Sequence, residues 1–413
     1  MAGVVQPRRR AAVAFVFVAV MLDMIALGII APVLPGLIKQ LIHGDAALAA
    51  RYVGWFTALW ALMQFIFSPI IGGLSDRFGR RPVLLASMFG LAADYMVMAL
   101  APTIGWLLVG RIISGITSSS FSTANAYIAD ITPPEERAGR FGLLSAAFGI
   151  GFIGGPALGG LLGQLDPRLP FWGAGALCFL NGLYGAFVVP ESLKKEHRSP
   201  FSLKIANPVG AFDLYKTTPG LLALGAVMFL YYMAHQVLQS TWIPYVAYRY
   251  HWASGMIGFS LVLVGINSVL TQSFVTRPFV ARFGERTALA VGLAAAAAGF
   301  ALYGWAAYGW LFLATVPATF FMNIAYPATQ GLMSRSISAK EQGRLQGANT
   351  ALMAIASTIG PILFTEVFAQ SISGWAPWAP VGLAFYVSAT FMLLALILAF
   401  AMRPAPVAAA AVE

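Results

Sequence analysis

Four ionisable side chains lie within or close to long apolar stretches, where charge is costly. Asp23 and Asp94 each lie about twelve residues into such a stretch, Arg111 lies within another, and Glu366 lies towards the end of a fourth. At about 1.5 Å per helical residue, both aspartates would sit near the middle of a bilayer. A charge there costs at least roughly 2.5–3.5 kcal/mol, so such groups are typically functional. They suit reversible binding of a proton or a charged substrate group. The alternatives are neutral, internally hydrogen-bonded aspartates, and a Glu366 that simply reaches the interface.

Other polar residues in the apolar stretches, mostly amides, could line a cavity. The candidates are Gln64, Asn125, His235, Gln236, Gln239, Asn267, Gln272, Asn323 and Gln330. A lone histidine in an apolar helix, such as His235, is more often a packed polar group than a titrating one. Five aromatic residues could line a site for a flat ligand or belong to the lipid-facing and interfacial belt; these are Trp60, Tyr231, Tyr232, Trp242 and Tyr326.

The elements that must position these residues are membrane-spanning helices. Of the 413 residues, 59% are apolar and 10% are charged, whereas soluble domains are roughly 45–50% apolar and about 25% charged. The apolar runs are continuous rather than alternating, which excludes a membrane β-barrel. We therefore predict an all-α membrane protein with twelve transmembrane helices, at roughly 11–38, 52–74, 82–101, 104–129, 141–163, 171–190, 219–243, 254–276, 287–307, 309–333, 346–369 and 379–402.

The basic residues predict the orientation of these helices. With the N-terminus inside, 20 of the 25 lysines and arginines fall on the cytoplasmic side and 4 on the other, with Arg111 inside a span. This split follows the positive-inside rule and predicts a multi-pass inner-membrane protein with both termini in the cytoplasm. The net charge of +10 is thus a topology signal, and we expect no nucleic-acid partner. The first stretch, about residues 11–37, is too long for a signal peptide and is expected to remain as a span.

Enzymatic chemistry is not indicated by this sequence. The only cysteine, Cys178, can form neither an internal disulfide nor a cysteine-based metal site. We find no phosphate-binding loop, nucleophile elbow or metal-ligand spacing. We expect no cofactor and no metal. Because the sequence indicates no ATP site, any uphill transport would draw on an ion gradient.

An internal repeat divides the chain into two similar parts. At an offset of 205 residues, Arg77-Phe78-Gly79 matches Arg282-Phe283-Gly284, Gly155-Pro156 matches Gly360-Pro361, Glu136 matches Glu341, and Gly142 matches Gly347. Parallel six-helix repeats with a substrate site between them are one way in which transporters are built. We predict a first half over 1–190, a cytoplasmic linker over 191–218 and a second half over 219–413.

The loop after the second span carries the most specific motif. Residues 72–84 read GGLSDRFGRRPVL, which resembles the signature loop of the major facilitator superfamily, G-x-L-A-D-R-x-G-R-K-x-x-L. The acid could sit against a helix N-terminus, and the arginines could pair with Asp130, making a charged latch rather than an ordinary basic loop. The expected cytoplasmic gate comprises Gly72, Asp76, Arg77, Gly79, Arg80, Arg81 and Asp130.

Two further motifs resemble motifs of that superfamily, and the first of them resembles the one found in its antiporters. The fifth span contains Gly142, Gly151, Gly155, Pro156, Gly159 and Gly160. Glycines three and four residues apart line one helix face and permit close packing, which a generic packing helix would also use. Arg111, within Gly110-Arg111-x-x-x-Gly115, resembles a family motif linked to proton transfer.

Within the superfamily the chain most resembles the tetracycline/proton antiporters. The likeness lies in Leu22 to Pro35, Ala61 to Gln64, Asp94-Tyr95 and Ala126 to Asp130. Those antiporters resemble one another in a histidine in span 8 and an aspartate in span 9, where this chain has Asn267-Ser268 and Ala294 to Ala298.

We therefore expect proton-coupled export of small drug-like molecules, tetracycline among the candidates, by alternating access. The expected partners are a small-molecule substrate, protons and the lipid bilayer, with the chain acting as a monomer. The alternatives are a superfamily transporter of a sugar, amino acid or siderophore, and a membrane receptor or scaffold. The second of these needs neither buried charges nor a latch.

Overall fold

The computed structural model describes residues 17–18, 20–22, 24–26, 28–118, 120–132, 137–193, 195–198, 214–215, 220–338, 341–374 and 379–401. Within these residues the regular secondary structure is helical throughout, without a strand. The chain forms two compact units, one of residues 1–45, 59–206 and 252–265 and the other of residues 46–58, 207–251 and 266–413. Each unit is described by itself below.

The first six predicted spans coincide with helices. A bent pair, Val20–Ile30 followed by Leu34–Leu41 (α2), covers the first run. The others are α3 (Ala46–Phe78), α4 (Arg80–Leu100), α5 (Ile104–Thr117) with α6 (Ser120–Ile131), α7 (Arg137–Leu165) and α8 (Leu169–Val188). Proline at the start of α2 and α8 suits a first helical turn, whose amide groups have no intrahelical partner.

The remaining spans follow the same correspondence. They are α10 (Leu221–Ser240) with α11 (Trp242–Arg249), α12 (Ser254–Leu270) with the π-helix η5 (Thr271–Val275), α13 (Thr276–Trp305), α14 (Gly309–Thr315) with the 3₁₀-helix η6 (Pro317–Ile324) and α15 (Ala325–Arg335), α16 (Gln342–Ile372), and α17 (Leu383–Ala401). A single 3₁₀ turn, η2 (Lys195–His197), lies between α8 and α10.

The all-α membrane class is confirmed by the length and hydropathy of these helices. Among the described residues, 8 helices could cross a membrane on their own, or 9 if the bent pair counts as one span. The stretch Ser254–Trp305 counts once there although it holds two predicted spans, and α5 and Gly149–Leu165 are apolar but shorter. The predicted spans are therefore present, several of them as broken helices.

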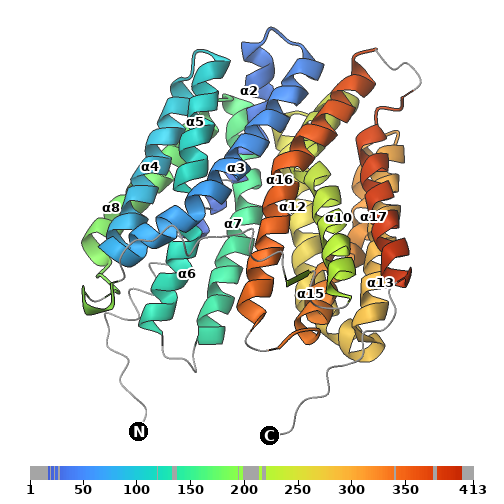
Figure 1. Ribbon diagram of the computed structural model, residues 1–413. Helices are drawn as coiled ribbons and strands as arrows, with labels where there is room; N and C mark the ends of the chain where they lie inside the picture. Colours follow the sequence, from blue (N-terminus) through green and yellow to red (C-terminus); the bar gives the residue numbers. More distant parts are fainter. Residues whose placement is uncertain are drawn as a thin grey trace, which may run out of the picture. The chain divides into compact units, whose positions relative to one another are not determined.

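In the first unit, α4 packs against α5, α6 and α8, and α7 packs against α6 and α8. Figure 1 shows α4, α5 and α8 running side by side. Apolar side chains from several of these helices form a core of Val20, Leu84, Met88, Ala124, Tyr127, Ile128, Ala147 and Val189. This packing fixes α4 and α5, which carry Asp94 and Arg111.

In the second unit, α10 packs against α16 and α17, and α13 packs against α15, η6 and α17. The α10, α13, α16 and α17 ribbons are labelled in Figure 1. Its core is aromatic: Trp242 makes an edge contact with Tyr303, and Tyr245 makes one with Phe385. Edge-to-face pairs of this kind add about 0.5–1.5 kcal/mol beyond burial.

The 205-residue repeat predicted from the sequence is visible in the backbone. Gly79 before α4 has φ 107° and ψ 157°, and Gly284 within α13 has φ 79° and ψ 162°. This conformation is essentially restricted to glycine. Pro156 lies inside α7 and its repeat partner Pro361 lies inside α16. The two repeats therefore share their chain breaks and prolines.

Candidate functional site

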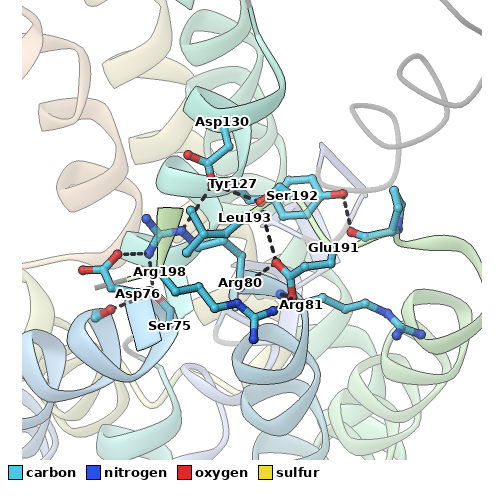
Figure 2. Close-up of polar contacts among 12 residues, drawn as sticks. Ser75, Asp76, Arg80, Arg81, Tyr127, Asp130, Glu191, Ser192, Leu193 and Arg198 are labelled. Atoms are coloured by element: carbon cyan, nitrogen blue, oxygen red, sulfur yellow. Dashed lines mark hydrogen bonds and ion pairs between the residues drawn. The ribbon is translucent and has the colours of Figure 1, made fainter. Parts of the chain in front are cut away.

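The loop between α3 and α4 is organised around Arg80. Figure 2 shows its guanidinium reaching two acids and a hydroxyl. The Nη1 atom lies 2.5 Å from Asp76 Oδ1 and donates to Ser75 Oγ at 2.6 Å, while Nε lies 3.3 Å from Asp130 Oδ2. The expected pairing of an arginine in this loop with Asp130 is therefore present.

Glu191, which the sequence reasoning missed, caps the N-terminus of α4. Its Oε1 accepts from the Arg80 amide at 2.8 Å and its Oε2 accepts from the Arg81 amide at 3.3 Å (Figure 2). A carboxylate is favoured at a helix N-terminus by the free amide groups and the helix dipole. Gly79 makes room for it, because a Cβ there would collide with the Glu191 carboxylate.

The segment after α8 is tied to α6 at the same place. Ser192 Oγ donates to Asp130 Oδ2 at 3.0 Å, and the Tyr127 hydroxyl donates to the Pro190 carbonyl at 2.9 Å. Arg198 lies 4.0 Å from Glu191. The cluster of Ser75, Asp76, Arg80, Asp130, Glu191 and Ser192, here called the motif cluster, thus joins α3, α4, α6 and the chain after α8.

Not every expected gate residue joins the motif cluster. Arg81 donates to the Ala186 carbonyl of α8 at 2.6 Å. Arg77 is exposed and lies over its neighbour Phe78, with 5.2 Å between the guanidinium carbon and the ring centre. A Cβ on Gly72 would meet no atom within 4 Å. The structure therefore gathers Asp76, Arg80 and Asp130 and leaves the other side chains outside the cluster.

Asp94 is completely buried in α4. The positive charge of Arg111 of α5 acts on it, yet neither of its carboxylate oxygens has a hydrogen-bond partner in the described part of the chain. Gly110 allows this approach, since a Cβ there would lie 2.8 Å from Asp94 Oδ1. Arg111 Nε is buried without a partner as well. A carboxyl group in such surroundings is costly as an unpaired charge and far less costly when it holds a proton.

The glycines of α7 bring that helix against its neighbours, as the spacing predicts. A Cβ on Gly151 would lie 2.7 Å from the Met21 carbonyl, one on Gly155 would lie 2.7 Å from the Gly28 Cα, and one on Gly159 would overlap the Ile29 carbonyl. These three glycines therefore form the face that contacts the first helix. Gly160 instead approaches Ser254 and Gly258 of α12.

Some expected residues have no described side-chain environment. Asp23 lies outside the described residues, and so does the side chain of Asn125, although its backbone belongs to α6. Gly142 and Pro156 both belong to α7. Gln64 of α3 and Asn323 of η6 are half-buried, whereas Gln239 near the end of α10 is exposed.

Glu366 of α16 is engaged in an ion pair. Arg51 of α3 donates to both carboxylate oxygens, at 2.8 Å and 3.1 Å, and Gln370 donates to Oε1 at 3.0 Å. Each partner's side chain is 40% exposed. Next to this pair α3 and α16 touch closely, since a Cβ on Gly54 would lie 2.9 Å from the Pro361 carbonyl.

Amide and phenol groups of the second unit form a hydrogen-bonded chain. The Tyr215 hydroxyl donates to Asn349 Oδ1 at 2.7 Å, Asn349 Nδ2 donates to Gln330 Oε1 at 3.1 Å, and Gln330 Nε2 donates to the Tyr326 hydroxyl at 3.2 Å. Burial raises the pKa of the Tyr215 phenol, so it stays protonated as a donor. Gln330 is thereby placed in a polar row with Tyr326, whose ring is 39% exposed.

The other polar candidates of the second unit make separate hydrogen bonds outside this chain. Asn267 donates weakly to Thr319 at 3.4 Å, and Gln272 donates to Ser268 on its own helix at 3.1 Å. Gln236 is buried and donates to Ser357 of α16 at 3.1 Å. These contacts knit α12, η6, α10 and α16 within the unit. Trp242 is buried in the aromatic core and lines no surface, whereas Trp60 of α3 donates to Ser118 at 3.3 Å.

Comparisons with known proteins agree with this architecture. The sequence profile of the Major Facilitator Superfamily matches residues 16–236 and again residues 224–412. In three dimensions the chain resembles a D-xylose–proton symporter, with a TM-score of 0.77 at 16% identity over 96% of this chain and 98% of the other. It also resembles the human organic anion transporter MFSD10, with a TM-score of 0.68 at 24% identity over 95% and 100% of the two chains.

The protein is thus a membrane transporter of the major facilitator superfamily. Within that superfamily it belongs to the family of the tetracycline resistance proteins. It is 42% identical to the class C protein of Escherichia coli over 91% of this chain and 93% of that protein. It is 37% identical to the class G protein of Vibrio anguillarum, over 86% and 90% of the two chains.

Proposed function

We propose that this transporter exports tetracycline and related drug-like molecules across the inner membrane in exchange for protons. The kinship to tetracycline resistance proteins supports the substrate. The observation that carries the coupling is Asp94, a completely buried carboxyl whose oxygens have no hydrogen-bond partner among the described residues and which faces Arg111. A group so placed can hold a proton at little cost and must lose it to become charged.

In this proposal Asp23 and Asp94 bind protons, and Arg111 stabilises the ionised form of Asp94. The halves 1–190 and 219–413, joined by the linker 191–218, alternate between inward-facing and outward-facing states, with both termini in the cytoplasm. The motif cluster acts as the cytoplasmic gate. Glu366, paired with Arg51, holds α3 on α16. The chain works as a monomer and as a transporter rather than an enzyme.

The α7 glycines support drug–proton exchange as the transport mode, because they pack that helix tightly on the first helix. The candidate substrate contacts are the polar side chains of the second unit that end in the half-exposed Tyr326. Competition between proton and drug for one conformational state would couple the two fluxes, because each ligand shifts the equilibrium only by its differential affinity.

Inverted membrane vesicles energised by respiration test this proposal. Tetracycline should raise the pH of the lumen as protons leave in exchange for the drug, and should accumulate inside with the same time course. If the protein is present but the vesicles respond to a sugar, amino acid or siderophore and not to tetracycline, the protein transports a metabolite rather than an antibiotic. Silence to every compound would overturn transport of both classes.

A further inference from the structure

The second unit holds a half-buried histidine, His235, in the C-terminal half of the membrane helix α10. Its Nδ1 lies 3.1 Å from the carbonyl oxygen of Tyr231, one turn earlier. A carbonyl can only accept, so Nδ1 carries a hydrogen, and in the neutral ring Nε2 is an acceptor. That Nε2 is buried and has no hydrogen-bond partner within the described residues. A buried acceptor without a donor destabilises the fold, so a role for this nitrogen is expected.

The neighbouring aromatic rings would favour a positive charge on this imidazole. The centres of the His235 and Tyr231 rings are 4.0 Å apart and the planes differ by 31°. Phe300 of α13 meets the imidazole edge-on, with 5.7 Å between ring centres. A cation within about 6 Å of a ring centre is attracted to the ring face, most strongly where water is excluded. The Tyr231 ring therefore attracts a protonated imidazolium more strongly than it attracts the neutral imidazole.

Among the residues that the structure describes, no charged side chain contacts His235. The side chains near His235, or near Ala234 and Gln236 on either side of it, come from five helices. They are Tyr231 and Tyr232 of α10, Phe300 of α13, Tyr326 of α15, Ser357 of α16 and Ser388 of α17. A second acceptor, Gln236 Oε1, is likewise buried without a partner in this part of the structure. The site therefore has two acceptors in need of a donor.

The edge of this group reaches the surface of the second unit at Tyr326. Its ring contacts both Tyr231 and Tyr232, at 6.2 and 6.1 Å between ring centres, and is 39% exposed. The polar row of Gln330 and Asn349 continues from its hydroxyl. Amides in a membrane helix are poorly suited to lipid, so this row indicates a wet face.

We propose that His235 is a proton-binding group of the second half, which takes up and releases one proton during each transport cycle. This inference rests on the proposed antiport. Hydronium gives its proton to the Nε2 lone pair and leaves as water, and the ring becomes an imidazolium stacked on Tyr231. The reverse step returns the proton to water on the other side of the membrane. The uptake fills the one ring position that lacks a partner.

The first experiment separates exchange from proton coupling in proteoliposomes. His235→Asn keeps a donor for the Tyr231 carbonyl but cannot bind a proton. It should retain exchange of labelled for unlabelled tetracycline at equal pH within about twofold, and lose uptake driven by a pH gradient by at least about tenfold. The matched control is His251→Asn, in the connection between α11 and α12, which should behave as the wild type. Unchanged gradient-driven uptake with an unchanged proton-to-drug ratio in His235→Asn would overturn the proposal.

A second measurement keeps the test decisive if His235→Asn folds poorly. The chain has only 4 histidines, so the ring nitrogens of the unmutated protein can be resolved by nuclear magnetic resonance with labelled histidine. The Nε2 signal of His235 should change to that of an imidazolium in part of the range from pH 5 to 8, with a midpoint shifted by tetracycline. A signal that stays neutral throughout, with and without drug, would overturn the proposal. If wild-type proteoliposomes exchange no tetracycline, antiport fails instead, while the histidine titration still reports on His235.

Discussion

The two repeats of this transporter place an ion pair at the same position with opposite polarity. In the first, Arg80 follows the glycine break and pairs with Asp130 at 3.3 Å. At 205 residues further on, Glu285 follows Gly284 and pairs with Arg335 at 3.0 Å. The arginine is 12% exposed in the first pair and 77% exposed in the second. The repeat has thus kept a contact between the same two helix ends while exchanging its charges.

The two repeats also differ in the charges that they carry within the membrane-spanning helices. The positions equivalent to Asp94, Arg111 and Ser114 are Gly299, Val316 and Thr319. In the second unit a Cβ on Gly299 would lie 2.5 Å from a methyl group of Thr319, so apolar contact replaces the buried charges. The repeat therefore preserves backbone breaks and helix neighbours, which packing demands, and leaves the charges free to specialise.

The largest effect should come from Asp94→Asn. The amide cannot ionise, so the first half loses its buried proton carrier, and we expect tetracycline-driven alkalinisation of inverted vesicles to be abolished at an unchanged amount of protein in the membrane. Asp166→Asn, in the turn between α7 and α8, is the matched control and should leave antiport intact. Normal antiport in Asp94→Asn would remove this residue from the coupling mechanism.

The next largest effect should be a difference in transport rate when each of the two ion pairs is removed. Arg80→Ala leaves Asp76 and Asp130 without their shared cation, and we expect the initial rate of tetracycline uptake to fall at least about tenfold, or about 1.4 kcal/mol. Arg335→Ala removes a largely solvated side chain and should change the rate less than about twofold. Equal losses would show that both pairs act as gates.

An exchange of charges sharpens this contrast. The double variant with Arg80→Glu and Asp130→Arg gives the first pair the polarity of the second. It should not restore uptake, because a glutamate at position 80 would repel Asp76, which the Arg80 side chain binds. Recovery to wild-type rates would show that only the pair itself matters.

The two glycine breaks should differ in stability rather than in rate. At either position a non-glycine residue meets backbone strain of order 1–3 kcal/mol. Gly284→Ala should cost no more than this, since a Cβ there meets no atom within 4 Å. Gly79→Ala should cost more, because the Cβ also displaces Glu191 from the α4 N-terminus. Thermal unfolding in detergent measures the difference, and a more stable Gly79→Ala would contradict the capping role of Glu191.

The smallest effect should come from Glu366→Gln. Its carboxylate is held by Arg51 and each side chain is 40% exposed, so the pair contributes only about 0–1 kcal/mol. We expect the proton-to-drug ratio to stay unchanged and the uptake rate to fall by less than about threefold. A changed ratio in reconstituted vesicles would return Glu366 to the coupling residues.

Several features of the site could be predicted from the sequence because they depend on local spacing. The pairing of an arginine in the α3–α4 loop with Asp130 followed from the motif, and the packing of Gly151, Gly155 and Gly159 followed from helical periodicity. Glu191 could not be predicted, since it lies 111 residues from the amide of Arg80 that it caps. A signal did exist: an acid directly after the sixth span, where basic residues otherwise predominate.

The sequence by itself determined the membrane class, the spans, the repeat and the family, because hydrophobic length, basic-residue distribution and motif spacing act locally along the chain. Only the tertiary structure decided which partner each polar group receives. It joined Glu366 to Arg51 and packed His235 against Tyr231. Within the described residues it left the Asp94 oxygens and one ring nitrogen of His235 without a hydrogen-bond partner. Such choices depend on which faces of distant helices meet, and helix packing sets those contacts through shape rather than through the order of residues.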